Sequence, residues 1–269
     1  MSGHQTAETT RPLALVTGAS SGIGLELAKQ FAENGFDLVV AAEDDELDSA
    51  RPALEQLGAS VETVQVDLAT SQGVEQLHTQ LGSLGRPLAA AALNAGVGVN
   101  GRFDEISLDD DLRLVALNVA STVHLTKLLV RDMVPRGEGR LLFTASVAAT
   151  MPGPYYATYA ASKSFVHSFA EALRHEYKDL GITVTSLMPG PTDTEFFDRA
   201  DMGDTKVGRS DSNDDPADVA RDGFEALMSG KDKVVAGSTM NKVQTAGGKL
   251  MPDPVKAAAH ASMTKPDSD

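Results

Sequence analysis

Three glycines between a β-prone run and a helical pattern are the feature that most constrains the fold of this chain. The apolar run Leu13–Thr17 leads into Gly18-Ala-Ser-Ser-Gly22-Ile-Gly24, and apolar residues at helical spacing follow. A diphosphate at the start of a helix needs close backbone approach, which a Cβ would block. Gly24, one turn into the helix, lets the helix pack closely on the sheet. The loop predicts a dinucleotide site made by Gly18, Ser20, Ser21, Gly22, Ile23 and Gly24, the alternative being a tight turn without a ligand.

Short apolar runs alternate with helical patterns along the rest of the chain. Strands are predicted at 13–17, 38–42, 61–66, 88–93, 140–144, 182–188 and 234–236. Helices are predicted at 47–57, 74–84, 156–180 and 216–228, with two adjoining helices over 108–134. This alternation indicates an α/β fold, a Rossmann-type doubly wound parallel sheet of about seven strands with helices on both faces.

One composition-uniform domain is expected over residues 12–237, because no linker divides it. Residues 1–11 are polar and are expected to form a disordered tail. Residues 238–269 are expected to form a C-terminal extension, a surface helix followed by a disordered end.

Charge and composition exclude several classes of function. The chain of 269 residues has a formal net charge of −15, which argues against nucleic acid and against an anionic membrane surface as partners. It contains no cysteine, so disulfides and thiolate chemistry are excluded. No apolar run such as 88–93 is long enough to cross a bilayer, and no metal-binding pattern is present. We therefore expect a cytoplasmic protein with metal-free chemistry.

A tyrosine and a lysine four residues apart are the candidate reacting pair. Tyr159-Ala-Ala-Ser-Lys163 puts both side chains on one helix face. An ammonium near a phenol lowers the phenol's pKa, which is about 10 when unperturbed, and makes it a proton donor and acceptor near neutral pH. Tyr155 and Tyr156 have no cation at the same spacing. The alternative is a helical tyrosine and lysine that merely share a surface.

Further residues occur in the order and spacing of a known family. They are Asp67 after the third apolar run, Asn94-Ala-Gly96, Asn118, Ser146 and Pro189-Gly190 followed by Thr194. With the glycine loop and Tyr159-x-x-x-Lys163, they make the chain resemble the short-chain dehydrogenase/reductase family over about residues 12–237. Leu93 and Ala145 depart from the usual asparagine and serine, and neither change removes a reacting group.

The resemblance implies an oxidoreductase that moves a hydride between a nicotinamide cofactor and an alcohol/carbonyl substrate. It makes Tyr159 the general acid–base, with Ser146 holding the substrate oxygen. It gives Asn118 the role of holding a water that relays protons to Lys163, the alternative being an internal helix asparagine satisfied by backbone.

The resemblance also distributes the cofactor among the motifs. It implies that Lys163 binds the nicotinamide ribose, Thr194 the carboxamide and Asp67 the adenine. The other cofactor-binding residues expected on this basis are Leu68, Asn94, Ala95, Gly96, Asn118, Tyr159, Pro189, Gly190 and Thr192.

Acidic residues after the second strand bear on which nicotinamide binds. The run Glu43-Asp44-Asp45-Glu46 stands where an NADP site in this family has an arginine, and the glycine loop carries none. A carboxylate repels a 2′-phosphate and accepts a hydrogen bond from a free 2′-hydroxyl. NAD is therefore expected, with Glu43 or Asp44 on the ribose and NADP as the alternative. These acids also suit an ordinary helix start.

The substrate pocket is expected after Pro189 and near Ser146. Val147, Met151, Phe196 and Phe197 are the expected substrate contacts beside Ser146 and Tyr159, and they suggest a partly apolar alcohol or ketone. The two phenylalanines also suit ordinary packing of a short helix. A second reading of the whole chain is a non-catalytic nicotinamide-nucleotide sensor of the same fold. The resemblance further implies a homo-oligomer, a tetramer or dimer, formed through helices over 108–134 and 156–180.

Overall fold

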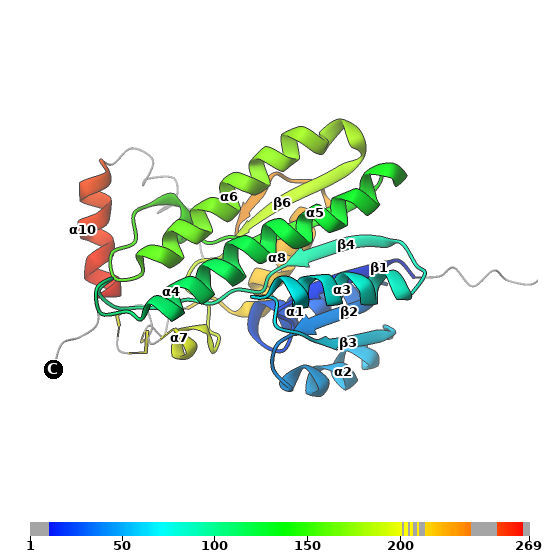
Figure 1. Ribbon diagram of the computed structural model, residues 1–269, viewed down its shortest axis with the longest axis horizontal. Coiled ribbons are helices and arrows are strands. Elements are labelled where there is room, and N and C mark those ends of the chain that lie inside the picture. Colours follow the sequence, from blue (N-terminus) through cyan, green and yellow to red (C-terminus); the bar gives the residue numbers. More distant parts are fainter. Residues whose placement is uncertain are drawn as a thin grey trace, which may run out of the picture.

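The computed structural model describes residues 11–200, 202–203, 205–206, 209, 213–237 and 252–265. Within them, a parallel sheet is covered by helices on both faces (Figure 1). Except for Arg11, the expected N-terminal tail lies outside the described residues, as does much of the C-terminal extension.

Seven parallel strands form one sheet in the order β3-β2-β1-β4-β5-β6-β7. Their bounds are β1 Leu13–Thr17, β2 Asp37–Ala42, β3 Val61–Gln65, β4 Leu88–Leu93, β5 Gly139–Thr144, β6 Ile182–Met188 and β7 Lys233–Val235. The strand order reverses between β1 and β4, which is the point where a doubly wound fold binds its ligand. The predicted fold class and strand count are confirmed.

The helices divide between the two faces of the sheet. On one face lie α1 (Gly22–Glu33), α2 (Glu46–Gln56) and α8 (Pro216–Met228). On the other lie α3 (Ser71–Ser83), α5 (Thr122–Met133) and α6 (Ala157–Tyr177), with α4 (Leu108–Val115) leading into α5. Successive residues of β1 alternate between the two cores, because neighbouring strand side chains point to opposite faces. Burial on both sides explains why the central strands β1 and β4 are almost wholly apolar, whereas the edge strand β3 carries Glu62, Thr63 and Gln65.

A π-helical turn joins α4 to α5 and places Asn118. The two predicted helices over 108–134 are one continuous helical segment, with residues Ala116–Ser121 wound as a π-helix. Thr122 Oγ1 donates to the Asn118 carbonyl at 2.9 Å within this turn. Single π turns occur often at functional sites, because the extra residue shifts a side chain out of the helical register.

The same segment, Leu108–Arg136, is the one helix among the described residues that is long and apolar enough to cross a membrane. Half of its most apolar window is buried inside the protein, where α5 packs on the sheet, and core helices commonly meet the same criteria. The length and hydropathy of this segment are therefore those of a helix packed in a protein core.

The C-terminal extension contains one described helix, α10 (Asp253–Thr264), which lies at the surface of the protein. One face of it packs across the loop that precedes α6 (Figure 1). His260 and Thr264 of this helix are buried, so one of its faces belongs to the interior. The periodicity of 253–264 is weak, which is why the sequence did not indicate a packed face.

Candidate active site

A cavity of about 540 Å³ opens at the carboxyl ends of the strands. It runs from the glycine loop, past the ends of β4 and β5, to α10. Among the predicted residues it is lined by Gly18, Ser20, Ser21, Gly22, Ile23, Gly24, Glu43, Asp44, Leu68, Asn94, Ala95, Gly96, Ser146, Val147, Met151, Tyr159, Lys163, Pro189, Gly190, Thr192, Thr194, Phe196 and Phe197. Asp67 and Asn118 are not part of this lining: Asn118 is buried and Asp67 is half-exposed.

The glycine loop is open on the side of the cavity. Gly18 and Gly22 have φ of +65° and +54°, which glycine adopts without strain. A Cβ on Gly22 would stand 3.0 Å from Thr194 Cγ2, and one on Gly24 would clash with the Gly18 carbonyl oxygen. Ser21 precedes α1 without capping it through its side chain, and the first turn of α1 carries no acidic residue. The loop therefore fits a diphosphate at this helix start.

Thr17 holds the loop against the end of β4. Its Oγ1 accepts hydrogen bonds from the backbone N–H groups of Asn94 and Ala95, at 3.0 and 3.1 Å. The Asn94 amide in turn donates to the Thr17 carbonyl at 3.2 Å and the Gly18 carbonyl at 3.3 Å. Asn94 thus braces the glycine loop, in addition to lining the cavity.

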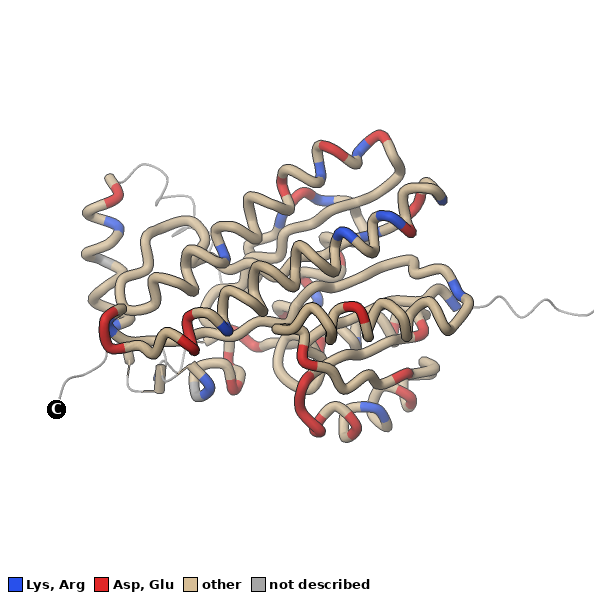
Figure 2. Tube along the Cα trace, in the orientation of Figure 1, with Lys and Arg blue, Asp and Glu red and all other residues tan. Residues whose placement is uncertain are grey.

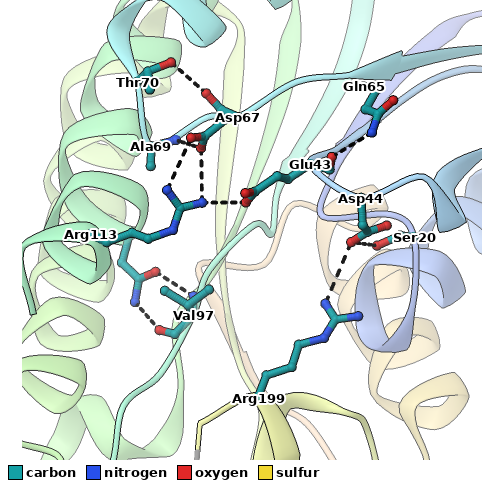
Figure 3. Close-up of polar contacts among 11 residues, drawn as sticks. Ser20, Glu43, Asp44, Gln65, Asp67, Ala69, Thr70, Val97, Arg113 and Arg199 are labelled. Atoms are coloured by element: carbon teal, nitrogen blue, oxygen red, sulfur yellow. Dashed lines mark hydrogen bonds and ion pairs between the residues drawn. The ribbon is translucent and has the colours of Figure 1, made fainter. Parts of the chain in front are cut away.

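The acids after β2 are joined to two arginines from distant elements (Figure 3). Arg113 of α4 pairs with Glu43 at 2.6 Å and with Asp67 at 3.3 Å. Arg199, at the end of α7 (Phe196–Arg199), lies 3.9 Å from Asp44. Sequence patterns did not indicate these arginines, because ion pairs between residues 70 positions apart leave no local pattern.

Asp44 is the better fit to a ribose hydroxyl. Its Oδ2 accepts from Ser20 Oγ at 3.0 Å, while its Oδ1 is buried with no hydrogen-bond partner. A buried oxygen without a donor costs free energy, which a hydroxyl donor would relieve. Glu43 is instead engaged by Arg113. The turn as a whole stays acidic, as Figure 2 shows between β2 and α2.

The carboxylate of Asp67 is bound by other residues of the protein and does not line the cavity. Its Oδ1 accepts from the Ala69 backbone at 2.8 Å, and its carboxylate faces Arg113 (Figure 3). The neighbouring Leu68 lines the cavity. The expected contact of Asp67 with adenine would therefore be made from the edge of the site.

Lys163 is buried and Tyr159 is half-buried, and both lie beside Ser146. Lys163 Nζ lies 5.7 Å from the centre of the Tyr159 ring and donates to the Thr144 carbonyl at 2.9 Å. Burial raises the pKa of Tyr159 to about 12, and a hydrogen bond with Ser146 lowers it by less. Burial also lowers the pKa of Lys163 to about 8.

The expected acidification of the phenol by the lysine is therefore absent in the protein alone. Desolvation disfavours the phenolate more than the ammonium favours it, and the ammonium binds a carbonyl. Further positive charge near the ring is needed to lower the pKa toward neutrality.

Asn118 is fully engaged by the protein. Its Oδ1 accepts from Val97 N–H at 2.9 Å, and its Nδ2 donates to the Val97 carbonyl and to Ser162 Oγ at 2.9 and 3.0 Å. A Cβ on Gly96 would stand 3.0 Å from Asn118 Oδ1 and 3.3 Å from Lys163 Nζ. The side chain thus fixes the strand end that borders the lysine, which matches the backbone-satisfied alternative for its amide.

The substrate side contains residues that the sequence did not single out. Tyr156 stacks on Tyr159 with ring centres 5.7 Å apart, and its hydroxyl hydrogen-bonds His260 Nε2 of α10 at 2.7 Å. Phe196 lies 5.3 Å from Tyr159, ring centre to ring centre, as expected of a pocket wall. The contact between Tyr156 and His260 spans 104 residues, so no spacing in the sequence points to it.

Comparisons with known proteins agree with this geometry. The family model described as short chain dehydrogenase matches residues 12–204. Gluconate 5-dehydrogenase of Gluconobacter oxydans is 32% identical over 191 residues, covering 69% of this chain and 73% of that protein.

Two similar solved structures contain a bound nicotinamide cofactor. A short-chain dehydrogenase from Sphingobium yanoikuyae in complex with NADPH has a TM-score of 0.78 at 28% identity, covering 83% of this chain and 87% of its own. A short-chain dehydrogenase/reductase from Burkholderia phymatum in complex with NAD has a TM-score of 0.76 at 25% identity, covering 89% of this chain and 92% of its own. With the family model matching most of the chain, this protein belongs to the short-chain dehydrogenase family of oxidoreductases.

Proposed function

We propose that this protein is an NAD-dependent oxidoreductase that moves a hydride between the nicotinamide and an alcohol/carbonyl substrate, with Tyr159 as general acid–base. The observation that carries the proposal is that Tyr159 lines one cavity with Ser146, Lys163 and an uncapped, glycine-lined helix start. A pure nucleotide sensor has no need of a half-buried phenol in contact with a serine hydroxyl.

Each of these side chains has a part in handling the proton. Ser146 is oriented by accepting from the Ala148 N–H at 3.1 Å, and its hydroxyl donates to the Pro189 carbonyl over a long 3.5 Å, a contact that a substrate oxygen would replace. Tyr159 takes the proton of an alcohol or gives one to a carbonyl oxygen. Nicotinamide supplies the hydride acceptor or donor when bound, and its oxidised form carries the positive charge that favours the phenolate.

Lys163 supports the same step from the other side. With its pKa at about 8, it is mainly protonated at neutral pH and still able to release a proton. We assign Lys163 to the nicotinamide ribose. Its ammonium has three N–H donors, so it can bind a ribose hydroxyl beside or in place of the Thr144 carbonyl. Thr194 is assigned the carboxamide. Asn118 is assigned a supporting part in the proton relay. Its amide is held by Val97 and Ser162, so it acts by fixing the backbone beside Lys163.

NAD is preferred over NADP in this proposal because of Asp44. A 2′-phosphate would meet Asp44 and Glu43, whereas a hydroxyl would donate to the unpartnered Asp44 Oδ1. Arg113 and Arg199 do not reverse the sign, because each is paired with acids.

A homo-oligomer is proposed through α4, α5 and α6. Leu108, Leu112, Val115 and Phe165 on these helices are exposed apolar side chains, between 39% and 70% accessible. Such a patch is typical of an interface. Whether the copies form a dimer or a tetramer is measured by light scattering, and the cytoplasmic location stays a prediction from the sequence.

The test is a turnover screen with both cofactors on the purified protein. Ketones and secondary alcohols of sugar, steroid, acyl and small aliphatic type are offered with NADH, NADPH and their oxidised forms. Turnover with NADH, and tighter binding of NADH than NADPH, is the expected result. Binding of NADH without reduction of any ketone would favour the sensor reading, and tighter NADPH binding would refute the cofactor assignment.

A further inference from the structure

Helix α10 is fastened to the substrate side of the cavity at both of its buried polar residues. His260 Nδ1 donates to the Pro152 carbonyl at 3.0 Å, which leaves Nε2 to accept from the Tyr156 hydroxyl. Thr264 Oγ1 donates to the Pro154 carbonyl at 2.9 Å, and Asn100 donates to the Thr264 carbonyl at 3.0 Å. Because Tyr156 stacks on Tyr159, these bonds set α10 at a fixed position relative to the proposed reacting group.

One face of α10 forms a wall of the cavity. Lys256, His260, Met263 and Thr264 line it, and their spacing of four, three and one residues puts them on a single helix face. The opposite wall is apolar, with Met151, Phe196 and Met202 among its residues. The chamber beyond Tyr159 therefore suits an apolar substrate body and carries a cation on one side.

Lys256 is the cation that this chamber leaves for a ligand. Among the described residues that line the cavity, the other lysine and arginine are committed: Lys163 to the Thr144 carbonyl, and Arg199 to Glu195 and the acids after β2. The side chain of Lys256 is 13% exposed, and its Nζ pairs with Asp253 at 3.1 Å. Asp253 is itself 77% exposed.

The pairing with Asp253 is weak enough to be exchanged. An ion pair with a solvent-exposed acid stabilises a protein only slightly, because water screens the attraction. An ammonium carries three donors, so a second carboxylate could be bound alongside or in place of Asp253. Lys256 also lies in the first turn of α10, where the helix dipole disfavours a lysine, and its i,i+3 pair with the exposed Asp253 offsets this only in part.

We propose that Lys256 selects substrates that carry a carboxylate at the far end of an apolar body from the reacting carbon. This inference rests on the proposed function for the reacting end and adds the chemistry of the other end. Lys256 is one helical turn, about 6 Å of rise, from His260. The ring of Tyr156 lies between His260 and Tyr159, with ring centres 5.3 Å and 5.7 Å from theirs. The ammonium and the phenol thus lie at different parts of the chamber, and a series of substrate lengths measures the separation.

The experiment compares matched substrates that differ only in charge. A series of straight-chain keto acids of increasing length is reduced with NADH beside the corresponding methyl esters. For wild-type protein the acid is expected to have at least a tenfold higher kcat/KM than its ester at the best length. Lys256→Met should remove this preference and leave ester turnover within about twofold, since about tenfold corresponds to one lost charge-assisted contact.

Two further variants sharpen the result. Asp253→Asn should raise the preference for the acid, because it frees the ammonium. Lys265→Met is the matched control: Lys265 is an exposed lysine just beyond the other end of α10, and it does not line the cavity. It should leave the preference unchanged.

The outcomes separate this inference from the proposed function. Turnover of esters and acids at equal kcat/KM by wild-type protein would overturn the role of Lys256 and leave the oxidoreductase intact. If no ketone is reduced at all, binding of octanoate against octanamide decides: tighter octanoate binding that Lys256→Met abolishes supports the site, and equal binding of the two refutes it.

Discussion

The cofactor end and the substrate end of the cavity are built in different ways. At the cofactor end, the glycine loop and the Asn94–Gly96 turn each follow their own strand directly, and Thr17 ties them together. At the substrate end, the walls come from the segment before α6, from α7 and from α10, joined by contacts such as Tyr156 with His260 across 104 residues. The first end is fixed by strand topology, and the second by which distant segments fold over it.

This difference predicts that chemistry can be removed without removing the cofactor. Tyr159→Phe should lower turnover by about three orders of magnitude, since general acid–base groups contribute roughly 10²–10⁴-fold. The affinity for NADH should change by less than threefold, because the ring and its stacking on Tyr156 are retained. Steady-state kinetics and fluorescence titration measure the two quantities.

Tyr156→Phe is the matched control for that variant. It removes a hydroxyl from the neighbouring stacked ring, which bonds His260 rather than Ser146. Turnover that falls equally in both variants would contradict the assignment of Tyr159 as the proton donor.

The two ends also differ in how well the sequence predicted them. The parallel sheet follows from apolar periodicity and the phosphate loop from the glycine pattern, because both depend on neighbours in the chain. The other proposed cofactor residues come from the resemblance to the family, and most of them line the cavity. No sequence pattern pointed to the contacts of Arg113 with Glu43, of Arg199 with Asp44, or of His260 with Tyr156. The two partners are 70, 155 and 104 residues apart, respectively. The position of α10 is likewise a property of the folded chain alone.

The pKa of Tyr159 shows a subtler limit of the sequence. Spacing correctly placed Lys163 beside the ring, yet burial dominates the electrostatics of both groups. A sequence gives the distance along a helix, but it does not give the desolvation at the end of a side chain.

Lys163 lies where the two ends meet, and its burial should be visible in folding stability. Its pKa falls to about 8 in the folded protein from 10.5 in the unfolded chain, so the unfolded state binds more protons between these values. Stability therefore rises with pH across this window, by up to about 3 kcal/mol from this group. Lys163→Met lacks this gain and should be the more stable protein at pH 7.

Urea unfolding of both proteins at pH 7 and pH 10 measures the effect. The difference in free energy of unfolding between Lys163→Met and wild type should shrink at the higher pH. The raised pKa of Tyr159 affects both proteins alike and acts above pH 10, so it largely cancels. A difference that is constant with pH would mean that Lys163 is not desolvated.

At the cofactor end alone, Asp44 and Glu43 should behave differently. Asp44→Asn is expected to weaken NADH binding by about tenfold, because it removes a charged acceptor whose Oδ1 has no other partner. Glu43→Gln should weaken it by less than threefold, since Glu43 is held by Arg113. Titrations with NADH and NADPH give both affinities, and equal losses in the two variants would move the ribose contact away from Asp44.

At the substrate end alone, the hydrogen bond between Tyr156 and His260 should control KM rather than cofactor affinity. Tyr156→Phe leaves the buried His260 Nε2 without its donor and loosens α10, so KM for bulky ketones should rise about three- to fivefold while the NADH affinity stays constant. Hydrogen exchange in residues 253–264 should become faster in the same variant.

His260→Phe breaks the same contact from the other side. If the two residues act through that one bond, the double variant should lose no more than either single variant, because their effects are coupled rather than additive. Additive losses, or an equal loss of NADH affinity, would mean that α10 serves the whole cavity instead of its substrate end. The two ends of the cavity would then differ in which parts of the chain build them, but substrate binding and cofactor binding would not be independent.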